Sequence, residues 1–529
     1  MRQSNWMAVV FFNNERHERH EKKIMIVALT VCMSVLAMNF FRAILCLFVV
    51  KKPLIFLEVS VKSCILVRQY YIIFFYGFYF SHTQEQRYFM DPRDLASLKY
   101  HRYPVPGKLH VVSSKPCETQ QDLSLAYTPG VAKPCLEIQE NPEAVYEYTG
   151  KGNSVAVVSD GTAVLGLGNI GPAAGLPVME GKSVLFKRFA DIDAIPLCLQ
   201  NVFTADGKTD ADKLIELTAA LEPTFGGINL EDIAAPACFK VETVLKKRMG
   251  IPVFHDDQHG TAIISLAALL NAVKLTGKKL SDIQMVVNGA GAAGISCTNF
   301  YISAGVRREN VIICDRKGVI TKENASNPEK MALATDRPCR TLAEAMRGAD
   351  LFLGCSSGNC VTEEMVRSMN PGAIVFAMAN PVPEIMPELA VQAGAMVVGT
   401  GRTDFPNQIN NVLGFPGIFR GALDVRARDI NEEMKLAASL ALAEIANMEI
   451  PEDIQGILTA AYPADAAAGM FAGKNPLKPT YVIPKPFDPR VVPHVARKVA
   501  EAAMQSGTAQ CPLDDLDQYE AELTLRLQR

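Results

Sequence analysis

The sequence predicts an α/β protein with two domains, the second of which contains a mostly parallel sheet. The chain has 529 residues, more than one hydrophobic core usually organises. Short apolar runs bounded by Gly and Pro alternate with helical stretches. From Ile251 onward this alternation becomes regular, which is typical of parallel strands wrapped by helices.

Residues 1–89 form an apolar extension that differs from the rest of the chain. Ile24 to Val50 is almost wholly apolar, is interrupted only by Arg42, and is long enough to span a bilayer. No convincing small-residue cleavage site follows it, which argues against a cleaved signal peptide. Composition becomes that of an ordinary soluble α/β protein at Met90. We therefore expect an artefactual upstream translation before Met90, and a retained membrane anchor is the alternative.

Residues 90–250 are predicted to form a mixed α/β domain. Apolar runs at Ser154–Val158 and Ser183–Phe186 stand there between helical stretches such as Lys213–Ala220 and Ala237–Lys247.

Residues 251–490 are predicted to form the second domain, and residues 491–529 a C-terminal tail. The predicted strands of this domain are Val253–His255, Gln284–Asn288, Val311–Asp315, Leu351–Gly354, Ile374–Ala379 and Met396–Gly399. The predicted helices are Thr261–Leu275, Ala292–Ala304 and an Ala-rich helix near Asn431–Ala446.

Two loops match the pattern Gly-x-Gly-x-x-Gly, and their surroundings distinguish them. The loop Gly289–Gly294 follows an apolar strand, leads into a helix and is followed about twenty residues on by Asp315, as in a dinucleotide-binding loop. Its glycines let the backbone approach a pyrophosphate at the helix N-terminus, and Asp315 accepts from a ribose hydroxyl. The loop Gly166–Gly171 runs into Pro172 and Pro177, so we expect a tight turn there rather than a helix.

The second domain is therefore predicted to be a Rossmann-like domain that binds NAD or NADP. Asp315 favours NAD because a carboxylate repels a 2′-phosphate, yet Arg316 and Lys317 could neutralise that charge and bind a phosphate. The choice between NAD and NADP stays open. The predicted cofactor-binding residues are Asn288, Gly289, Ala290, Gly291, Ala292, Ala293, Gly294, Asp315 and Arg316.

Two acidic pairs provide candidate metal ligands. Glu231-Asp232 and Asp256-Asp257 each follow an apolar stretch, and ligands of α/β sheets bind outside such strand ends. Grouped carboxylates suit Mg²⁺ or Mn²⁺, whereas the thirteen cysteines show no spacing typical of zinc. Judged by spacing alone, these four acids could equally well be solvated loop residues or helix caps instead of metal ligands.

The overall charge indicates a small-molecule partner. The net charge is -3 and charged residues are spread along the chain, so the sequence shows no basic patch of the kind that binds nucleic acid.

Between about Tyr100 and Asp429, a series of motifs resembles the malic enzymes, in the order found in that family. The motifs are Ser124–Ala132, Gly161–Asn169, Glu180–Lys182 with Val184–Lys187, Asn229–Asp232, Phe254–Ala262, Ala379–Pro381 and Asn407–Gly417. The chain is most similar to the short, prokaryotic-like type, because Ala163 stands where the longer animal-type enzymes carry an arginine. Some short relatives carry a phosphotransacetylase-like domain, and we expect none here.

The resemblance implies oxidative decarboxylation of L-malate to pyruvate and CO₂, with NAD or NADP and with Mg²⁺ or Mn²⁺. Decarboxylation of oxaloacetate and assembly as a homodimer or higher homo-oligomer are implied as well. The implied catalytic residues are Tyr127, Lys182 and Asp256. The implied metal ligands are Glu231, Asp232 and Asp257, and the implied substrate-binding residues are Asn380, Asn410 and Asn411. Without the family, Tyr127 and Lys182 would be interpreted as ordinary structural residues.

Two other interpretations of the residues compete with this one. The first is a dehydrogenase of hydroxy acids or amino acids that does not decarboxylate, and the acidic set and Tyr127 argue against it. The second is a membrane-tethered dinucleotide sensor, which Lys182 and Tyr127 make unattractive. The expected location is the cytoplasm, or a membrane surface if residues 24–50 are a genuine transmembrane helix.

Overall fold

The computed structural model describes residues 91–474 and 476–528. The chain divides into two units at Ser97, and both sheets lie within residues 98–529. Helix α3 (Pro92–Arg102) crosses that division. The apolar extension lies outside the described residues, so its nature stays a prediction.

The first sheet has four parallel strands with helices on both faces. In chain order the elements are β1 (Ser154–Ser159), α7 (Pro172–Ala190), β2 (Asp193–Cys198), α8 (Ala211–Ala219), β3 (Gly227–Leu230), α9 (Ala237–Arg248) and β4 (Val253–His255). The strand order is β2-β1-β3-β4. Val155 and Val157 join the buried cluster of Phe186 on α7, whereas Ala156 and Val158 face the cluster that includes α8 and α9. Both faces of β1 are thus buried, as expected of a parallel sheet covered on two sides.

Strand β4 belongs to this first sheet, although the sequence analysis grouped it with the later strands. Val253 stands opposite Ile228 of β3. The alternation of strands and helices gives their order along the chain, but it does not say which neighbour a strand pairs with.

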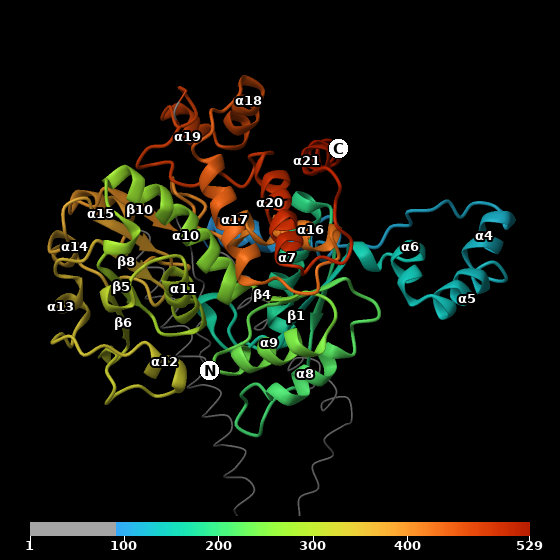
Figure 1. Cartoon of the computed structure of the whole chain (residues 1–529), viewed down its shortest axis with the longest axis horizontal. Coiled ribbons are helices and arrows are strands. Elements are labelled where there is room, and N and C mark those ends of the chain that lie inside the picture. The colour runs from blue at the N-terminus through green and yellow to red at the C-terminus, as the bar shows by residue number, and fades with distance from the viewer. Residues whose placement is uncertain (1–90, 475, 529) are drawn as a thin grey trace, which may run out of the picture. The chain divides into compact units, whose positions relative to one another are not determined.

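The second sheet has six strands in the order β10-β9-β8-β5-β6-β7. Figure 1 labels four of them, β10, β8, β5 and β6, side by side in this order. All of its pairings are parallel except that of β6 with β7. This confirms the predicted mostly parallel, Rossmann-like sheet. Its elements are β5 (Met285–Asn288), α11 (Ala292–Ser303), η5 (Arg308–Asn310), β6 (Val311–Asp315), β7 (Gly318–Val319), α12 (Pro328–Ala332), α13 (Leu342–Met346), β8 (Leu351–Gly354), α14 (Glu363–Arg367), β9 (Ile374–Ala377), α15 (Pro387–Gln392) and β10 (Val397–Thr400).

Helix α10 (Asp256–Thr276) connects the two sheets and is buried along most of its length. After the short helix η4 (Leu280–Asp282) the chain enters β5. Within the described residues α10 alone is long and apolar enough to cross a membrane, but 67% of its apolar window is buried inside the protein. The helices that follow the second sheet are η6 (Asn411–Leu413), α16 (Phe415–Asp424), α17 (Glu432–Ile445), α18 (Glu452–Ala461), α19 (Pro463–Ala467), α20 (Val491–Gln505) and α21 (Leu516–Leu527).

Two local predictions were wrong, and both concern α7. The helix begins at Pro172, directly after the loop Gly166–Gly171, because proline is tolerated in the first turn, where its missing N–H has no helical acceptor. The apolar run Ser183–Phe186 is a buried segment of the same helix. A run of four residues cannot by itself distinguish a buried helix from a strand.

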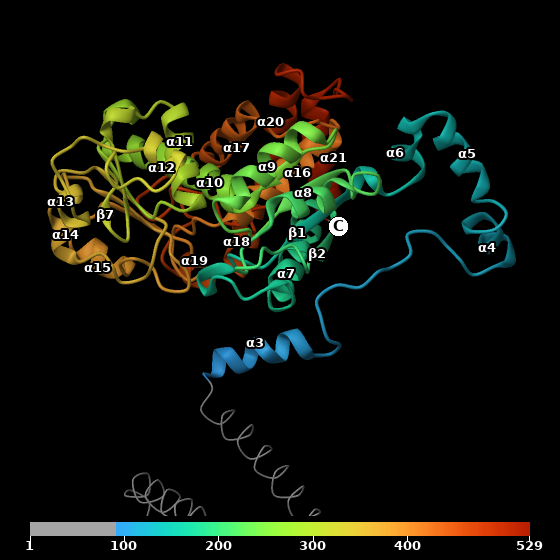
Figure 2. The ribbon, with the colours of Figure 1, turned by 90° about the horizontal axis from the view of Figure 1, so that it is seen from below.

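Residues 118–141, which we call the arm, contain α4 (Gln120–Ala126) and α5 (Ala132–Glu140). Within the described chain these residues hydrogen-bond to one another, except that Asn141 also accepts from the N–H groups of Glu143 and Ala144, and no arm residue is fully buried. Figures 1 and 2 both show α4 and α5 well away from the two sheets. The arm joins the rest of the unit through η1 (Pro142–Ala144), α6 (Val145–Tyr148) and η2 (Lys151–Asn153). There the Arg426 guanidinium lies 4.4 Å from the centre of the Tyr146 ring.

Close packing of α16 against α20 leads to a stability prediction. A Cβ atom on Gly421 would lie 2.4 Å from the Ala496 carbonyl oxygen, so Gly421→Ala forces the helices apart. We expect it to lower the free energy of unfolding by about 1–3 kcal/mol. Gly456 of α18 is the matched control, because a Cβ atom there would meet no described atom within 4 Å. Gly456→Ala should raise stability by about 0.5–1 kcal/mol. Equal midpoints for both variants in urea denaturation would contradict the packing.

Candidate functional site

A cavity of about 890 Å³ lies where strands of both sheets end. Its walls come from segments directly after β3, β8, β9 and β10, from the face of α7, and from the first turns of α10 and α11. Ligands of α/β proteins bind outside the carboxyl ends of parallel strands, so both sheets direct their binding edges into one space. The cavity brings together most of the residues predicted from the sequence, namely Lys182, Glu231, Asp232, Asp257, Gly291, Ala292, Ala293, Asn380, Asn410 and Asn411.

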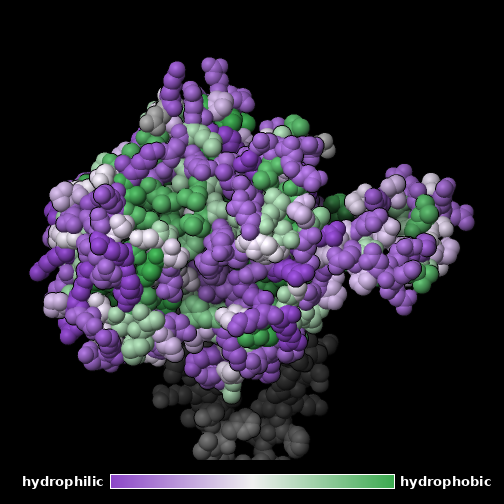
Figure 3. Space-filling model, viewed as in Figure 1, coloured by the Kyte–Doolittle hydropathy of each residue, from purple (hydrophilic) through white to green (hydrophobic). Residues whose placement is uncertain are grey.

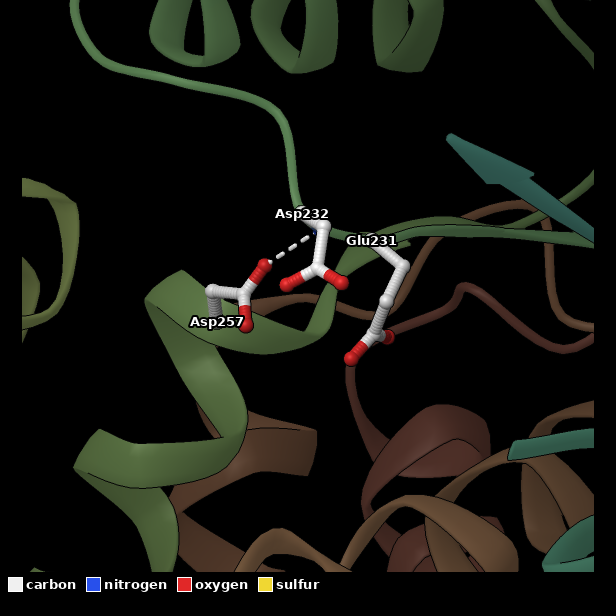
Figure 4. A group of neighbouring side chains, drawn as sticks. All are labelled: Glu231, Asp232 and Asp257. Atoms are coloured by element: carbon white, nitrogen blue, oxygen red, sulfur yellow. Dashed lines mark hydrogen bonds between the residues drawn. The ribbon is translucent and has the colours of Figure 1, made fainter. Parts of the chain in front are cut away.

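Glu231, Asp232 and Asp257 form a tight acidic cluster (Figure 4). One oxygen from each lies within 4.8 Å of the others, and no other such group of three or more exists in the described part of the chain. The Asp232 N–H donates to Asp257 Oδ2 at 2.7 Å. Glu231 and Asp232 directly follow β3, and Asp257 lies in the first turn of α10, so two adjacent strands fix the cluster.

The electrostatics of this cluster fit a divalent cation. Burial raises the pKa of Glu231, and burial together with the charge of Asp257 raises the pKa of Asp232 to about 8. The buried Asp232 Oδ2 accepts no hydrogen bond from the described residues. Crowded, poorly solvated carboxylates with a free oxygen are the donor set that Mg²⁺ and Mn²⁺ prefer.

Lys182, a residue of helix α7, lies beside the acidic cluster. Its Nζ is 2.9 Å from Glu231 Oε1 and 2.5 Å from Asp256 Oδ2, and it lies 4.3 Å from the centre of the Phe415 ring. Burial by itself would lower the pKa of Lys182, but Asp256 and Glu231 raise it above its usual value. Lys182 therefore carries its proton in this arrangement.

Asp256 and Asn411 form a second layer behind Lys182. Asp256 is fully buried, and Asn411 Nδ2 donates to its Oδ2 at 3.0 Å. Thr261 Oγ1 donates to Asn411 Oδ1 at 3.1 Å, which orients the amide. Asn410 accepts from the Val412 N–H and so caps η6. Asn380, after β9, is exposed in the cavity wall.

The glycine loop between β5 and α11 has the geometry of a nucleotide cradle. Gly289 has a φ of 120°, and a Cβ atom there would lie 2.2 Å from the Cys355 carbonyl oxygen. A Cβ on Gly294 would lie 1.7 Å from the Gly289 oxygen, so this glycine lets α11 pack against the loop. By contrast, no described atom lies within 4 Å of a Cβ built on Gly291, and no side chain of the described residues caps the N-terminus of α11. This arrangement leaves room and free N–H groups for a pyrophosphate.

Among the predicted catalytic residues, Tyr127 does not line the cavity and contacts no described residue that does, whereas Asp256 pairs with Lys182 behind the wall. Of the predicted cofactor residues, Asp315 and Arg316 at the end of β6 do not line the cavity either. Tyr127 ends α4 in the arm, and 69% of its surface is exposed. A motif identifies a residue, but it carries no information on which copy of the chain uses that residue.

Two cavity features were missed by the sequence analysis. Lys108 lines the cavity and donates to the Pro177 carbonyl at 2.6 Å, and burial lowers its pKa. Buried Glu384 accepts from the N–H groups of Ser356 and Ala379, and thereby ties together the loops after β8 and β9. Neither residue stands in a spacing that carries a chemical signal, so only the fold reveals them.

Comparisons with known proteins agree with this geometry. Two family models match the chain: malic enzyme, N-terminal domain, over residues 106–246, and malic enzyme, NAD binding domain, over residues 258–459. The chain is 53% identical over 434 residues to the NADP-dependent malic enzyme of Salmonella typhimurium, which covers 81% of this chain and 54% of that protein. It is 53% identical over 414 residues to the bifunctional malic/malolactic enzyme of Bacillus subtilis, covering 77% and 92%.

Solved structures give the same result. The crystal structure of malic enzyme from Pyrococcus horikoshii is 43% identical, with a TM-score of 0.70, and the match covers 82% of this chain and 95% of that one. The chain spans about half the length of several curated relatives that it matches, including the Salmonella protein.

The acidic cluster predicts Mn²⁺ binding in the absence of substrate. By calorimetry, Asp257→Asn should weaken binding by at least about tenfold because one of three anionic ligands is lost. Asp206→Asn removes an exposed carboxylate that pairs with Lys208 and Thr204 far along the chain from the cluster, and it should leave binding unchanged. Since protons compete for Asp232, whose pKa is raised to about 8, affinity should fall as the pH drops below 8. Wild-type affinity in Asp257→Asn would exclude this site.

Proposed function

Because the chain belongs to the malic enzyme family, we propose that it oxidises and decarboxylates L-malate to pyruvate and CO₂ while it reduces NAD or NADP. The observation that carries this proposal is the cavity in which Lys182 and the acidic cluster face the nucleotide loop. Dehydrogenation needs the base and the nucleotide, and decarboxylation of the resulting β-keto acid needs a positive charge near the C2 oxygen. A simple dehydrogenase without the acidic cluster would lack that charge, so the non-decarboxylating alternative is not favoured.

Glu231, Asp232 and Asp257 would hold the divalent cation. When bound, Mg²⁺ or Mn²⁺ supplies positive charge that orients the substrate carboxylate and polarises its C2 oxygen. Asn380 and Asn410 would donate amide hydrogens to substrate carboxylates, since both lie in the cavity wall. The same charge distribution would support decarboxylation of added oxaloacetate.

Lys182 would act as the general base. It takes the proton of the C2 hydroxyl while hydride leaves C2 for the nicotinamide, which gives oxaloacetate. The C3–C4 bond then breaks, CO₂ leaves, and C3 of the resulting enol is protonated to give pyruvate. The first step requires a neutral amine. Recruitment of Glu231 as a metal ligand would remove one of the two anionic partners that raise the pKa of Lys182. Asp256, held by Asn411, positions the amine for this step.

Tyr127 would protonate C3, and we propose that it comes from the arm of a second copy in a homodimer. The arm exposes several apolar side chains that an isolated chain leaves in water, among them Leu123, Leu125 and Leu136. Figure 3 shows apolar groups on the arm surface. The cavity is at the same time open to an incoming side chain. An exchanged arm would cover its apolar surface and complete the cavity in one contact.

A cytoplasmic location stays a prediction.

Stoichiometry tests the function directly. With L-malate and Mn²⁺, the purified chain should release one CO₂ for each reduced nucleotide, and chelation of the metal should abolish both signals. Reduced nucleotide without CO₂ would indicate a simple dehydrogenase. Binding of nucleotide with no turnover would indicate a sensor.

Mixing two inactive variants tests the arm exchange. Tyr127→Phe and Lys182→Ala should each lower turnover by at least about a hundredfold. In a coexpressed mixture, half of the dimers are mixed, and each has one site with both wild-type residues. Activity should therefore return to about a quarter of the wild-type value. No recovery in a mixture proven to contain mixed dimers would mean that each chain uses its own tyrosine.

A further inference from the structure

We propose that Lys108 binds the carboxylate of L-malate that the divalent cation does not hold, and that it thereby makes the cavity selective for dicarboxylates. The inference rests on the function proposed above. It adds a substrate-binding residue that decides which hydroxy acids the cavity accepts.

The charge balance of the cavity calls for a second cation. The acidic cluster has three carboxylates, and a divalent cation offsets the charge of only two of them. L-Malate brings two further negative charges, which repel the remaining one strongly where water is largely excluded. Lys182 cannot offset this excess, because it must be neutral to act as the base. The carboxylate that lies away from the divalent cation therefore needs a cationic partner of its own.

Lys108 is the side chain that supplies this charge. Among the described residues that line the cavity, Lys108 and Lys182 are the only lysines, and there is no arginine. Lys182 already pairs with Glu231 and Asp256, whereas Lys108 makes no ion pair within the described part of the chain. The more distant charge of Glu180 only partly offsets the effect of burial on the pKa of Lys108. Lys108 thus lacks an anionic partner that a substrate would have to displace.

Two hydrogen bonds hold the Lys108 amine at the cavity wall. Its Nζ donates to the Pro177 carbonyl at 2.6 Å and lies 3.0 Å from His101 Nε2. A charged lysine can only donate, so the ring nitrogen of His101 accepts. An ammonium group has three N–H donors, and one of them remains for a ligand. Pro177 and Lys182 both belong to α7 and both line the cavity, so this donor is held at the wall that carries the base.

Two glycines let the amine come this close to α7. A Cβ atom on Gly181 would lie 3.4 Å from Lys108 Nζ. Gly107 has a φ of 86°, and a Cβ atom there would lie 3.2 Å from Glu180 Oε1. The Gly107 N–H also donates to the His101 carbonyl at 3.1 Å, which closes the turn before Lys108. The lysine is therefore part of a preformed contact between this turn and α7.

Binding of L-malate without nucleotide tests the inference independently of turnover. In calorimetry with the purified chain and Mn²⁺, Lys108→Met should weaken L-malate binding at least about tenfold, because one charge-assisted hydrogen bond is lost. Lys108→Arg keeps the charge and should stay within about threefold of the wild type. Lys115→Met is the matched control, since it removes an exposed lysine from the same segment and should leave binding unchanged.

Oxalate separates the lost charge from a disturbed cavity. It can place one oxygen of each carboxylate on the cation, and it has no further group that reaches Lys108. Lys108→Met should therefore change oxalate affinity by less than about twofold under the same conditions. Equal weakening of oxalate and L-malate would mean that Lys108 supports the cavity as a whole, and it would overturn the inference. Wild-type affinity for L-malate in Lys108→Met would overturn it as well.

Kinetics with nucleotide then distinguish the two proposals. In Lys108→Met the KM for L-malate should rise at least about tenfold while kcat changes by less than about threefold, because the contact is made to the bound substrate and its carboxylate leaves as neutral CO₂. Turnover with an unchanged KM overturns the role of Lys108 and leaves the malic enzyme activity intact. Binding of L-malate that depends on Lys108, without any turnover, supports the carboxylate site and contradicts the proposed function.

Discussion

Burial of α10 between the two sheets is the constraint on which the site depends. Its apolar residues belong to the cluster that contains Val157 of the first sheet and Val287 of the second. Its first turn carries Asp256 and Asp257, and its flank packs against α11, which starts at the glycine loop. One rigid helix therefore sets the spacing between the acidic cluster and the nucleotide loop. Since interiors pack at crystal-like density, that spacing has little freedom to vary.

The acidic cluster shows how one carboxylate can serve two partners. Glu231 pairs with Lys182 and also belongs to the three-residue group that fits a cation. Glu231 cannot interact equally strongly with Lys182 and with a cation, because a carboxylate that moves toward the cation weakens its ion pair with the lysine. Proton affinity at Lys182 and cation affinity at the cluster are thus linked through a single side chain.

Much of this architecture could be predicted from the sequence, and the failures have physical causes. Strand β6 was predicted residue for residue, because a buried strand bounded by turns leaves a clear pattern. Ten of the predicted site residues line the cavity, because motifs and strand ends mark them in the sequence. Predictions failed where they depended on which strands pair or on the length of an apolar run. Strand β4 pairs with β3 in the first sheet, and the four-residue run Ser183–Phe186 lies in helix α7. The contact of Lys330 with Asp315 could not be predicted, because the two residues are fifteen positions apart and no regular spacing pairs them.

The late position of the helices that cover α10 also affects how the chain folds during synthesis. Ser439 of α17 donates to the Ile263 carbonyl, and Asn271 donates to the Ala443 carbonyl, so α17 covers α10 from more than 150 residues further along the chain. At ordinary rates of translation, α10 emerges on the order of ten seconds before this cover exists. For that interval an apolar helix of membrane-spanning length is exposed on the nascent chain, and it is a ready target for chaperones and for aggregation.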